Sequence, residues 1–278
     1  MRQPNWVVSH ASAAVFHQLP LRHPIPAEPE FIDPLPNSRR SRVHPRVRRR
    51  QFPRDEVVTV DDGPLAGLSL TSIARTAVDL ACLLPLPAAL AGVDAAARRE
   101  ALERVGVFGL RGSVSRVLAE STAMLSSALV AQRGSSAAAA AISSADPRRE
   151  SPPESYSAAH IVEAGLPPPT LQARLRTSVG DCYPDFYWDT WGVVGECDGW
   201  VKYDGTFGPD DGVLVRQYRR QRAMEEDLGL MVVRWHATDA IHRPQVVQRA
   251  IAGGLLSRGW DPSDSPMSAP HQVRRKWP

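Results

Sequence analysis

The chain has 278 residues, 43% of them hydrophobic, and a formal net charge of only +3. This length is enough for two domains, or for one domain with a large extension. Its apolar runs are too short to span a bilayer and its first residues form no apolar signal core, so we expect a cytoplasmic protein without a membrane partner. Three cysteines, an odd number without a C-x-x-C pair, argue against a disulfide framework and against a structural zinc site.

Segments of the first 60 residues are short and rich in proline. Residues 5–21 predict a short helix, and residues 30–35 and 55–63 predict strands. Between them, the run at residues 38–54 carries eight arginines. This run is a solvated loop, a polybasic arm that binds phosphate, or both, and its charge alone does not decide among these alternatives. Its candidate nucleic-acid-binding residues are Arg48, Arg49 and Arg50.

Hydrophobic periodicity becomes helical from residue 68 onward. Ser69 or Thr71 can cap a helix whose apolar stripe continues to Leu84. Alanine-rich helices follow, and the low-complexity residues 134–150 form either a last helix or a linker.

The domain boundary is predicted near residue 148, where the low-complexity segment ends. We expect an N-terminal domain at 1–148, with strands to about residue 60 and then helices. A second domain follows at 149–260, and residues 261–278 are expected to be a flexible tail.

The second domain opens with a strong helix-start signal. Ser151 at the cap, Pro152 in the first helical position and Glu154 three residues after the serine form a capping box, and Gly165 ends the helix. Three strands, a helix and a further strand follow, and the last strand can join the sheet in parallel through a right-handed crossover. We therefore predict an α/β unit with a mixed sheet flanked by helices, and an α+β fold overall. The expected elements are strands 170–178, 182–189 and 193–200, helix 213–228 and strand 230–236.

Three acids, Asp185, Glu196 and Asp198, lie in an otherwise apolar and aromatic stretch. Carboxylates are costly to bury unless a counter-charge or a metal binds them. If Thr190 and Trp191 are the two loop residues of a hairpin, Asp185 lies opposite Glu196, with Cβ atoms about 5 Å apart on one face. Asp198 shares that face because side chains alternate along a strand. A three-residue loop would put Asp185 and Glu196 on opposite faces, so the prediction depends on the register.

Carboxylate oxygens of this kind suit Mg²⁺ or Mn²⁺ rather than zinc. Such a metal activates water and stabilises the charge that develops on a phosphodiester. Lys202 stands out because the only other lysine is Lys276; it either assists at this site or pairs with Asp204 as an exposed cation. Glu154 either only caps its helix or extends the metal shell. The predicted catalytic residues are Asp185, Glu196, Asp198, Lys202 and Glu154, the first three of them as metal ligands.

The helix at 213–228 carries a cluster of arginines. It offers a phosphate-facing stripe, or else a solvated face whose charge is balanced by acids at the end of the helix. Its candidate nucleic-acid-binding residues are Arg216, Arg219 and Arg220.

The segments SPPES, YPDFYW, ECDGWVKY and RQRAMEEDLGLMVVRW resemble the very-short-patch-repair-like endonuclease domain of the PD-(D/E)XK superfamily, also called domain of unknown function 559. The resemblance covers about residues 150–240, and the E-x-D-G-x-x-K-Y hairpin is its most specific part. It implies a restriction-endonuclease-like fold in which Asp185 is the first acid, Glu196 the second, and Lys202 a displaced form of the motif's lysine. Asp198 stands where the superfamily's lysine usually lies.

The front half of the chain has a resemblance of its own. VSHASAAVFHQLPL and LTSIARTAVDLACLLP are similar to proteins that carry an abortive-infection-type antitoxin region ahead of such a nuclease domain. Those relatives commonly begin with a winged helix, whereas this chain begins almost at SHASAA, so we predict no helix-turn-helix.

The leading hypothesis is a metal-dependent DNA endonuclease or nickase that hydrolyses phosphodiester bonds in repair or phage defence. The alternative is a non-catalytic DNA-binding regulator or antitoxin-like protein with a degenerate nuclease fold, and a third is a structural protein that binds no nucleic acid. DNA is the expected partner, and a protein partner or a homodimer is left open. The sequence contains no Walker A, G-x-S-x-G or H-E-x-x-H motif.

Overall fold

The computed structural model describes residues 6–21, 27–34, 47–49, 53–112, 115–129, 134–199 and 211–264. The chain divides into two compact units, Met1–Ser155 and Tyr156–Pro278. The division falls a few residues after the predicted boundary, inside the helix that opens the second predicted domain. Helices combined with mixed sheets confirm the α+β class. None of the described helices is long and apolar enough to cross a membrane.

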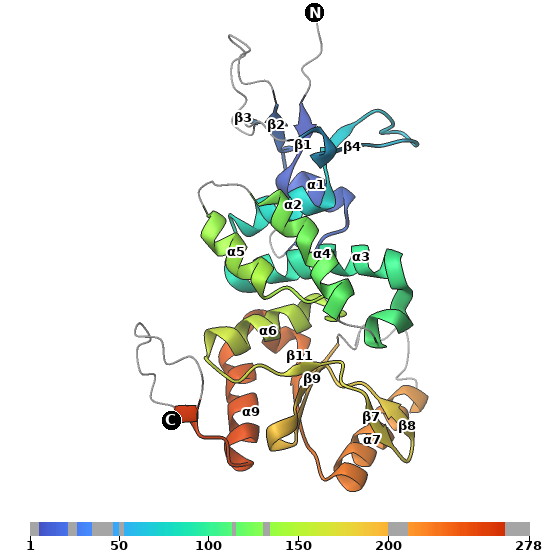
Figure 1. The fold of residues 1–278 in the computed structure, drawn as a ribbon, viewed down its shortest axis with the longest axis vertical. Coiled ribbons are helices and arrows are strands. Elements are labelled where there is room, and N and C mark those ends of the chain that lie inside the picture. Colours follow the sequence, from blue (N-terminus) through green and yellow to red (C-terminus); the bar gives the residue numbers. More distant parts are fainter. Residues whose placement is uncertain are drawn as a thin grey trace, which may run out of the picture. The chain divides into compact units, whose positions relative to one another are not determined.

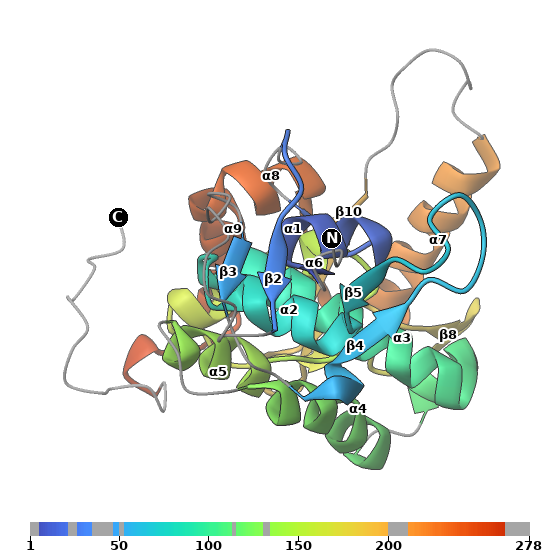
Figure 2. The same ribbon diagram turned by 90° about the horizontal axis from the view of Figure 1, so that it is seen from above.

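A sheet of short strands opens the first unit. Its elements are β1 (Val7–Val8), α1 (His10–Phe16), β2 (Phe31–Asp33), β3 (Val47–Arg49), the 3₁₀ turn η1 (Arg54–Glu56), β4 (Val57–Thr59) and β5 (Ser69–Thr71). The strands lie in the order β3-β2-β1-β5-β4 (Figure 2). Val8 of β1 pairs with Leu70 of β5, and both side chains pack with Ala13 of α1. The arginine-rich run is therefore not a loop throughout, because residues 47–49 pair in parallel with β2.

Helices make up the rest of the first unit. They are α2 (Ile73–Ala81), α3 (Leu86–Gly112), α4 (Ser115–Ala128) and α5 (Ser135–Ser143). The predicted cap at Ser69 or Thr71 is wrong, because both residues lie in β5. Ser72 is the N-cap of α2, and its Oγ accepts a hydrogen bond from the backbone N–H of Arg75 at 3.2 Å. The low-complexity segment, left open between helix and linker, forms α5.

A fully buried arginine joins two of these helices. The Arg75 side chain is 0% exposed, and its guanidinium contacts the Asp79 carboxylate at 2.8 Å and donates to the backbone carbonyl of Ala128. This contact ties the first turn of α2 to the end of α4, because a buried guanidinium must find acceptors.

The second unit is built around a mixed sheet. Its elements, counted from the helix that begins just before it, are α6 (Pro152–Glu163), β6 (Thr170–Leu171), β7 (Leu175–Thr177), β8 (Gly180–Cys182), β9 (Phe186–Trp188), the 3₁₀ turn η2 (Asp189–Trp191), β10 (Val193–Asp198), α7 (Asp211–Leu228), β11 (Met231–His236), α8 (Ala237–His242), α9 (Pro244–Ser257) and the 3₁₀ turn η3 (Pro262–Asp264).

The sheet has the order β11-β10-β9-β6. Strands β10 and β11 are parallel, as the predicted crossover through α7 requires, and β9 runs antiparallel to β10. The predicted strand at 170–178 is wrong as a single element: β6 joins the main sheet, whereas β7 pairs with β8 in a separate hairpin.

Helices cover both faces of this sheet (Figure 1). On one face, the indole N–H of Trp235 donates to the hydroxyl of Ser157 in α6 at 2.8 Å, and α9 brings Gly254 against Val193 and Val233. On the other face, residues of α7, of the sheet and of the β7-β8 hairpin form an apolar cluster. Its buried members are Cys182, Val194, Met224 and Leu230.

Candidate functional site

Strands β9 and β10 form the hairpin that the sequence predicted. Val193 pairs with Trp188, and continuing the same register places Asp185 opposite Glu196. Gly192, with φ 60° and ψ 38°, ends the turn in the left-handed region that glycine adopts without strain. The predicted register is therefore confirmed.

Alternation along β10 separates its acids from its cysteine. Val194, Glu196 and Asp198 lie on the face covered by α7, whereas the Cys197 thiol lies 4.0 Å from the hydroxyl of Ser157 on the opposite face. Asp185 is tied to the same strand, because its Oδ2 accepts a hydrogen bond from the backbone N–H of Cys197 at 2.9 Å. Its carboxylate is thus bonded to the backbone between the two acids of β10.

An arginine from α7 is the partner of Glu196. Nη2 of Arg220 lies 2.9 Å from Oε1 and 2.8 Å from Oε2 of the glutamate. The Glu196 side chain is only 6% exposed, whereas 40% of the Arg220 side chain remains exposed. A buried carboxylate is therefore neutralised through a single nitrogen of a half-exposed side chain.

A second arginine, from β11, is the partner of Asp198. Nε of Arg234 donates to Oδ2 at 3.0 Å and Nη2 contacts Oδ1, so two nitrogens hold the carboxylate. A third nitrogen, Nη1, donates to the side-chain oxygen of Gln221 in α7 at 3.3 Å. The parallel register places Arg234 directly beside Glu196. Arg234 therefore lies between the strand that carries the acids and the helix that covers them.

Burial and charge act on these groups in opposite directions. Burial is the largest influence on Glu196 and raises the pKa of its carboxyl, while the positive charges of Arg220 and Arg234 oppose that rise. The pKa of Arg234 is raised, first by its hydrogen bond to Asp198 and also by the negative charges of Glu196 and Asp185. All three predicted acids therefore contribute to raising the pKa of one guanidinium.

The cluster has the donor chemistry for a hard metal ion, although its present arrangement does not form a metal site. Within the described ranges, no group of three or more His, Cys, Asp or Glu side chains is placed to hold a metal ion. The reason is local, because Glu196 and Asp198 each bind a guanidinium at hydrogen-bond distance. A cation could join Asp185 and Glu196 only after Arg220 had left Glu196.

Glu154 has a local role at the start of α6. Its Oε1 accepts from the hydroxyl of Ser151 at 2.6 Å and its Oε2 accepts from the backbone N–H of Glu150 at 2.7 Å. Burial, its largest influence, raises the pKa of this carboxyl. The predicted capping box is thus changed in detail, because the serine donates to the glutamate rather than capping a backbone N–H. A part for Glu154 in a metal shell stays a prediction.

The other predicted residues fall into two groups. Arg216 and Arg219 are exposed on α7. Lys202 and Arg50 lie outside the described residues, and the side chains of Arg48 and Arg49 are not described although their backbones form β3.

Sequence reasoning missed Arg234 as a member of the site and assigned Arg220 to phosphate. The signal for Arg234 was present: if β11 is parallel to β10 and in step with it, VVGECD lies beside MVVRWH and the glutamate lies beside the arginine. No comparable signal fixes Arg220, because its contact depends on how α7 packs across the sheet.

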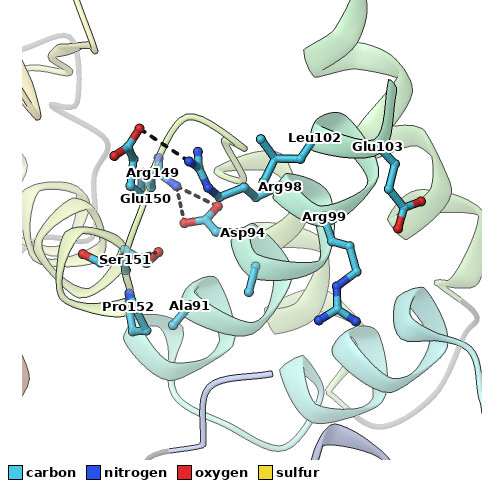
Figure 3. Close-up of a pocket in the computed structure, with 12 residues that line it drawn as sticks. Ala91, Asp94, Arg98, Arg99, Leu102, Glu103, Arg149, Glu150, Ser151 and Pro152 are labelled. Carbon is cyan, nitrogen blue, oxygen red and sulfur yellow. Dashed lines mark hydrogen bonds and ion pairs between the residues drawn. The ribbon is translucent and has the colours of Figure 1, made fainter. Parts of the chain in front are cut away.

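A pocket of about 430 Å³ lies in the first unit, away from these acids in the sequence (Figure 3). Its walls carry three arginines whose guanidiniums already have acceptors. Arg149 binds Asp94 at 2.7 Å, Arg98 donates to the backbone carbonyl of Pro147, and Arg99 donates to that of His17. These bonds join α3 to neighbouring segments, so we assign the arginines a structural role.

In comparisons with protein-family models, with curated proteins and with solved structures, no match to this chain was found. The resemblance to the very-short-patch-repair-like endonuclease domain and to the antitoxin region therefore stays an interpretation of the sequence.

Proposed function

We propose that the second unit is a metal-dependent DNA endonuclease or nickase that acts in the cytoplasm, with its site at Asp185 and Glu196. The observation that supports this most directly is the hairpin register: continued one residue beyond β9, it brings Asp185 opposite Glu196 of β10. A second observation that supports it is that the negative charges of Asp185 and Glu196 both raise the pKa of Arg234. Two converging carboxylates beside guanidiniums are the groups that phosphodiester hydrolysis needs.

The donor set fits Mg²⁺ or Mn²⁺ in kind, since carboxylate oxygens are their preferred protein ligands. When bound, the ion would stabilise charge on the phosphate and lower the pKa of water. Asp185 and Glu196 would hold it, because Asp198 is already bound by Arg234 through two nitrogens. Lys202 keeps its predicted part in orienting water or neutralising phosphate.

Plasmid nicking tests this proposal. The parent protein with Mg²⁺ should convert supercoiled plasmid to nicked circles, and Asp185→Asn or Glu196→Gln should lower the rate by at least about a hundredfold. Asp189→Asn is the matched control: this acid lies in the same hairpin, is exposed and bonds the hydroxyl of Tyr187. Carboxamide variants that nick like the parent would show that the site is elsewhere.

One observation favours the alternative of a non-catalytic DNA-binding protein: Glu196 and Asp198 are already neutralised by arginines. That alternative predicts DNA retention that weakens steeply with salt and no cleavage with Mg²⁺ or Mn²⁺.

A further inference from the structure

The guanidiniums of Arg220 and Arg234, which bind the acids of β10, differ in how many contacts hold them. Arg234 uses three nitrogens, on Asp198 and Gln221, and its side chain is 28% exposed. Arg220 contacts Glu196 through Nη2 alone, and 40% of its side chain is exposed. Of the two, Arg220 is the partner that can leave with the smaller loss of contacts.

Glu196 cannot easily remain without a cation. Its side chain is 6% exposed, and an ionised carboxylate at that depth needs a counter-charge or has to take up a proton. Whatever displaces Arg220 must therefore bring positive charge to the same oxygens. A divalent cation does so, and water alone does not.

A released Arg220 would still lie beside the site because α7 holds its backbone there. Arg216 lies one helical turn earlier and thus on the same side of the helix, where it is exposed. Guanidinium groups bind phosphate oxygens with charge-assisted hydrogen bonds. The helix therefore supplies an anion-binding arm at the place where Glu196 would lose its partner.

We propose that Arg220 is an exchangeable counter-ion: it neutralises Glu196 while the site is empty, and it moves to a backbone phosphate of the nucleic acid when a divalent cation takes its place. This inference rests on the proposed function. It assigns Arg220 a second contact, to the substrate. Metal binding and phosphate binding then favour each other, because the metal displaces Arg220 from Glu196 and the phosphate holds the displaced Arg220 away from Glu196.

The test uses one variant with two readouts of opposite direction. Arg220→Gln should bind Mn²⁺ at least about tenfold more tightly than the parent, measured by calorimetry or by the electron paramagnetic resonance of free Mn²⁺ without DNA, because a positive charge has been removed from the ligands. With Mn²⁺ at a fixed saturating concentration, the same variant should bind a phosphorothioate-protected DNA duplex more weakly than the parent does, and the slope of log K against log salt should fall by about one, because Arg220 reaches a phosphate only when the cation has replaced it.

The controls come from the same helix and the same site. Arg222→Gln removes an equal charge from α7, but Arg222 pairs with Glu226 rather than with Glu196, so it should leave Mn²⁺ affinity unchanged. Arg220→Lys keeps the charge and should keep the parent's Mn²⁺ affinity. Glu196→Gln added to Arg220→Gln should abolish the gain.

Both halves of the proposal have to hold. Mn²⁺ affinity that does not rise in Arg220→Gln overturns it, and so does an unchanged salt slope. The plasmid assay tests the proposed function separately. If the parent nicks DNA but the variant gains no Mn²⁺ affinity, the nuclease proposal stands and the proposal that Arg220 exchanges with the cation is overturned. If the parent never nicks DNA but the variant shows both effects, the exchange of Arg220 stands and the nuclease proposal is overturned.

Discussion

Adding one methyl group beside the acids should disturb the aromatic layer on the far side of the sheet. Gly195 precedes Glu196 in β10, and a Cβ built on it lies 2.8 Å from a ring atom of Trp235 and 3.1 Å from a ring atom of Trp188. Real Cβ contacts essentially never come below 3.0 Å. We therefore expect Gly195→Ala to force at least one indole ring to move.

Neither ring can move without losing contacts. Trp188 and Trp235 are 2% and 3% exposed, and their indole N–H groups donate to the carbonyl of Pro167 at 2.7 Å and to the hydroxyl of Ser157 at 2.8 Å. Overpacking of a core costs about 1–3 kcal/mol. Replacing glycine by alanine returns about 0.4–1 kcal/mol by restricting the unfolded chain. The net loss of unfolding free energy should be about 1–2 kcal/mol.

Urea unfolding followed by tryptophan fluorescence measures this loss. Gly199→Ala is the matched control, because a Cβ at that position meets no atom within 4 Å. It should leave stability unchanged or slightly raised. The reasoning about the indole rings is refuted if Gly195→Ala unfolds within about 0.5 kcal/mol of the control variant.

Three further predictions follow from buried groups. Burial raises the folded-state pKa of Glu196 above its ordinary value of 4.5. The stability that this carboxyl contributes is therefore full below pH 4.5 and is lost as pH rises through the folded-state pKa. In thermal unfolding between pH 4 and pH 7, the unfolding temperature of Glu196→Gln should rise relative to that of the parent as pH rises. Asp94→Asn should lower the unfolding free energy by about 3 kcal/mol because it leaves Arg149 without its buried partner, whereas Glu100→Gln, which breaks an exposed pair with Arg104, should change little. Ser72→Ala should cost about 1 kcal/mol in urea unfolding, since it removes the N-cap of α2, and a loss under a few tenths of a kcal/mol would contradict that role.

Elements with strong local signals were predicted well. The helix at Pro152 and the hairpin around Gly192 both follow from residues with distinctive backbone properties: proline has a φ fixed near the helical value, and glycine adopts the left-handed turn conformation without strain. The helix after residue 68 was predicted correctly, but its cap at Ser69 or Thr71 was wrong because the three residues before Ser72 pair with β4 and β1, a contact that local periodicity cannot reveal. The strand predicted at 170–178 failed for a similar reason, since β6 and β7 pair with different partners.

The acids of the candidate site could be found from sequence, and Arg234 could have been found from the parallel register of β10 and β11, but Arg220 could not. Asp185 falls opposite Glu196 because strand alternation and a turn determine the register, and both are local properties. Arg220 and Arg234 reach the same place only through the crossover of α7, which fixes the packing of a helix against two strands. Tertiary packing thus pairs two of the three carboxylates that were expected to bind a metal, Glu196 and Asp198, with arginines.

The acids have apolar surroundings because the first residues of β10 are buried, whereas its carboxyl end carries the charged side chains. Val193 and Val194 begin β10 and are buried against the helices, whereas Glu196 and Asp198 lie toward its carboxyl end, beside Arg234 in β11. In open α/β sheets, ligands bind outside the carboxyl ends of strands, where the chain leaves the core and side chains can be charged. The place of the site therefore follows from the crossover topology, whichever ligand the acids and arginines bind.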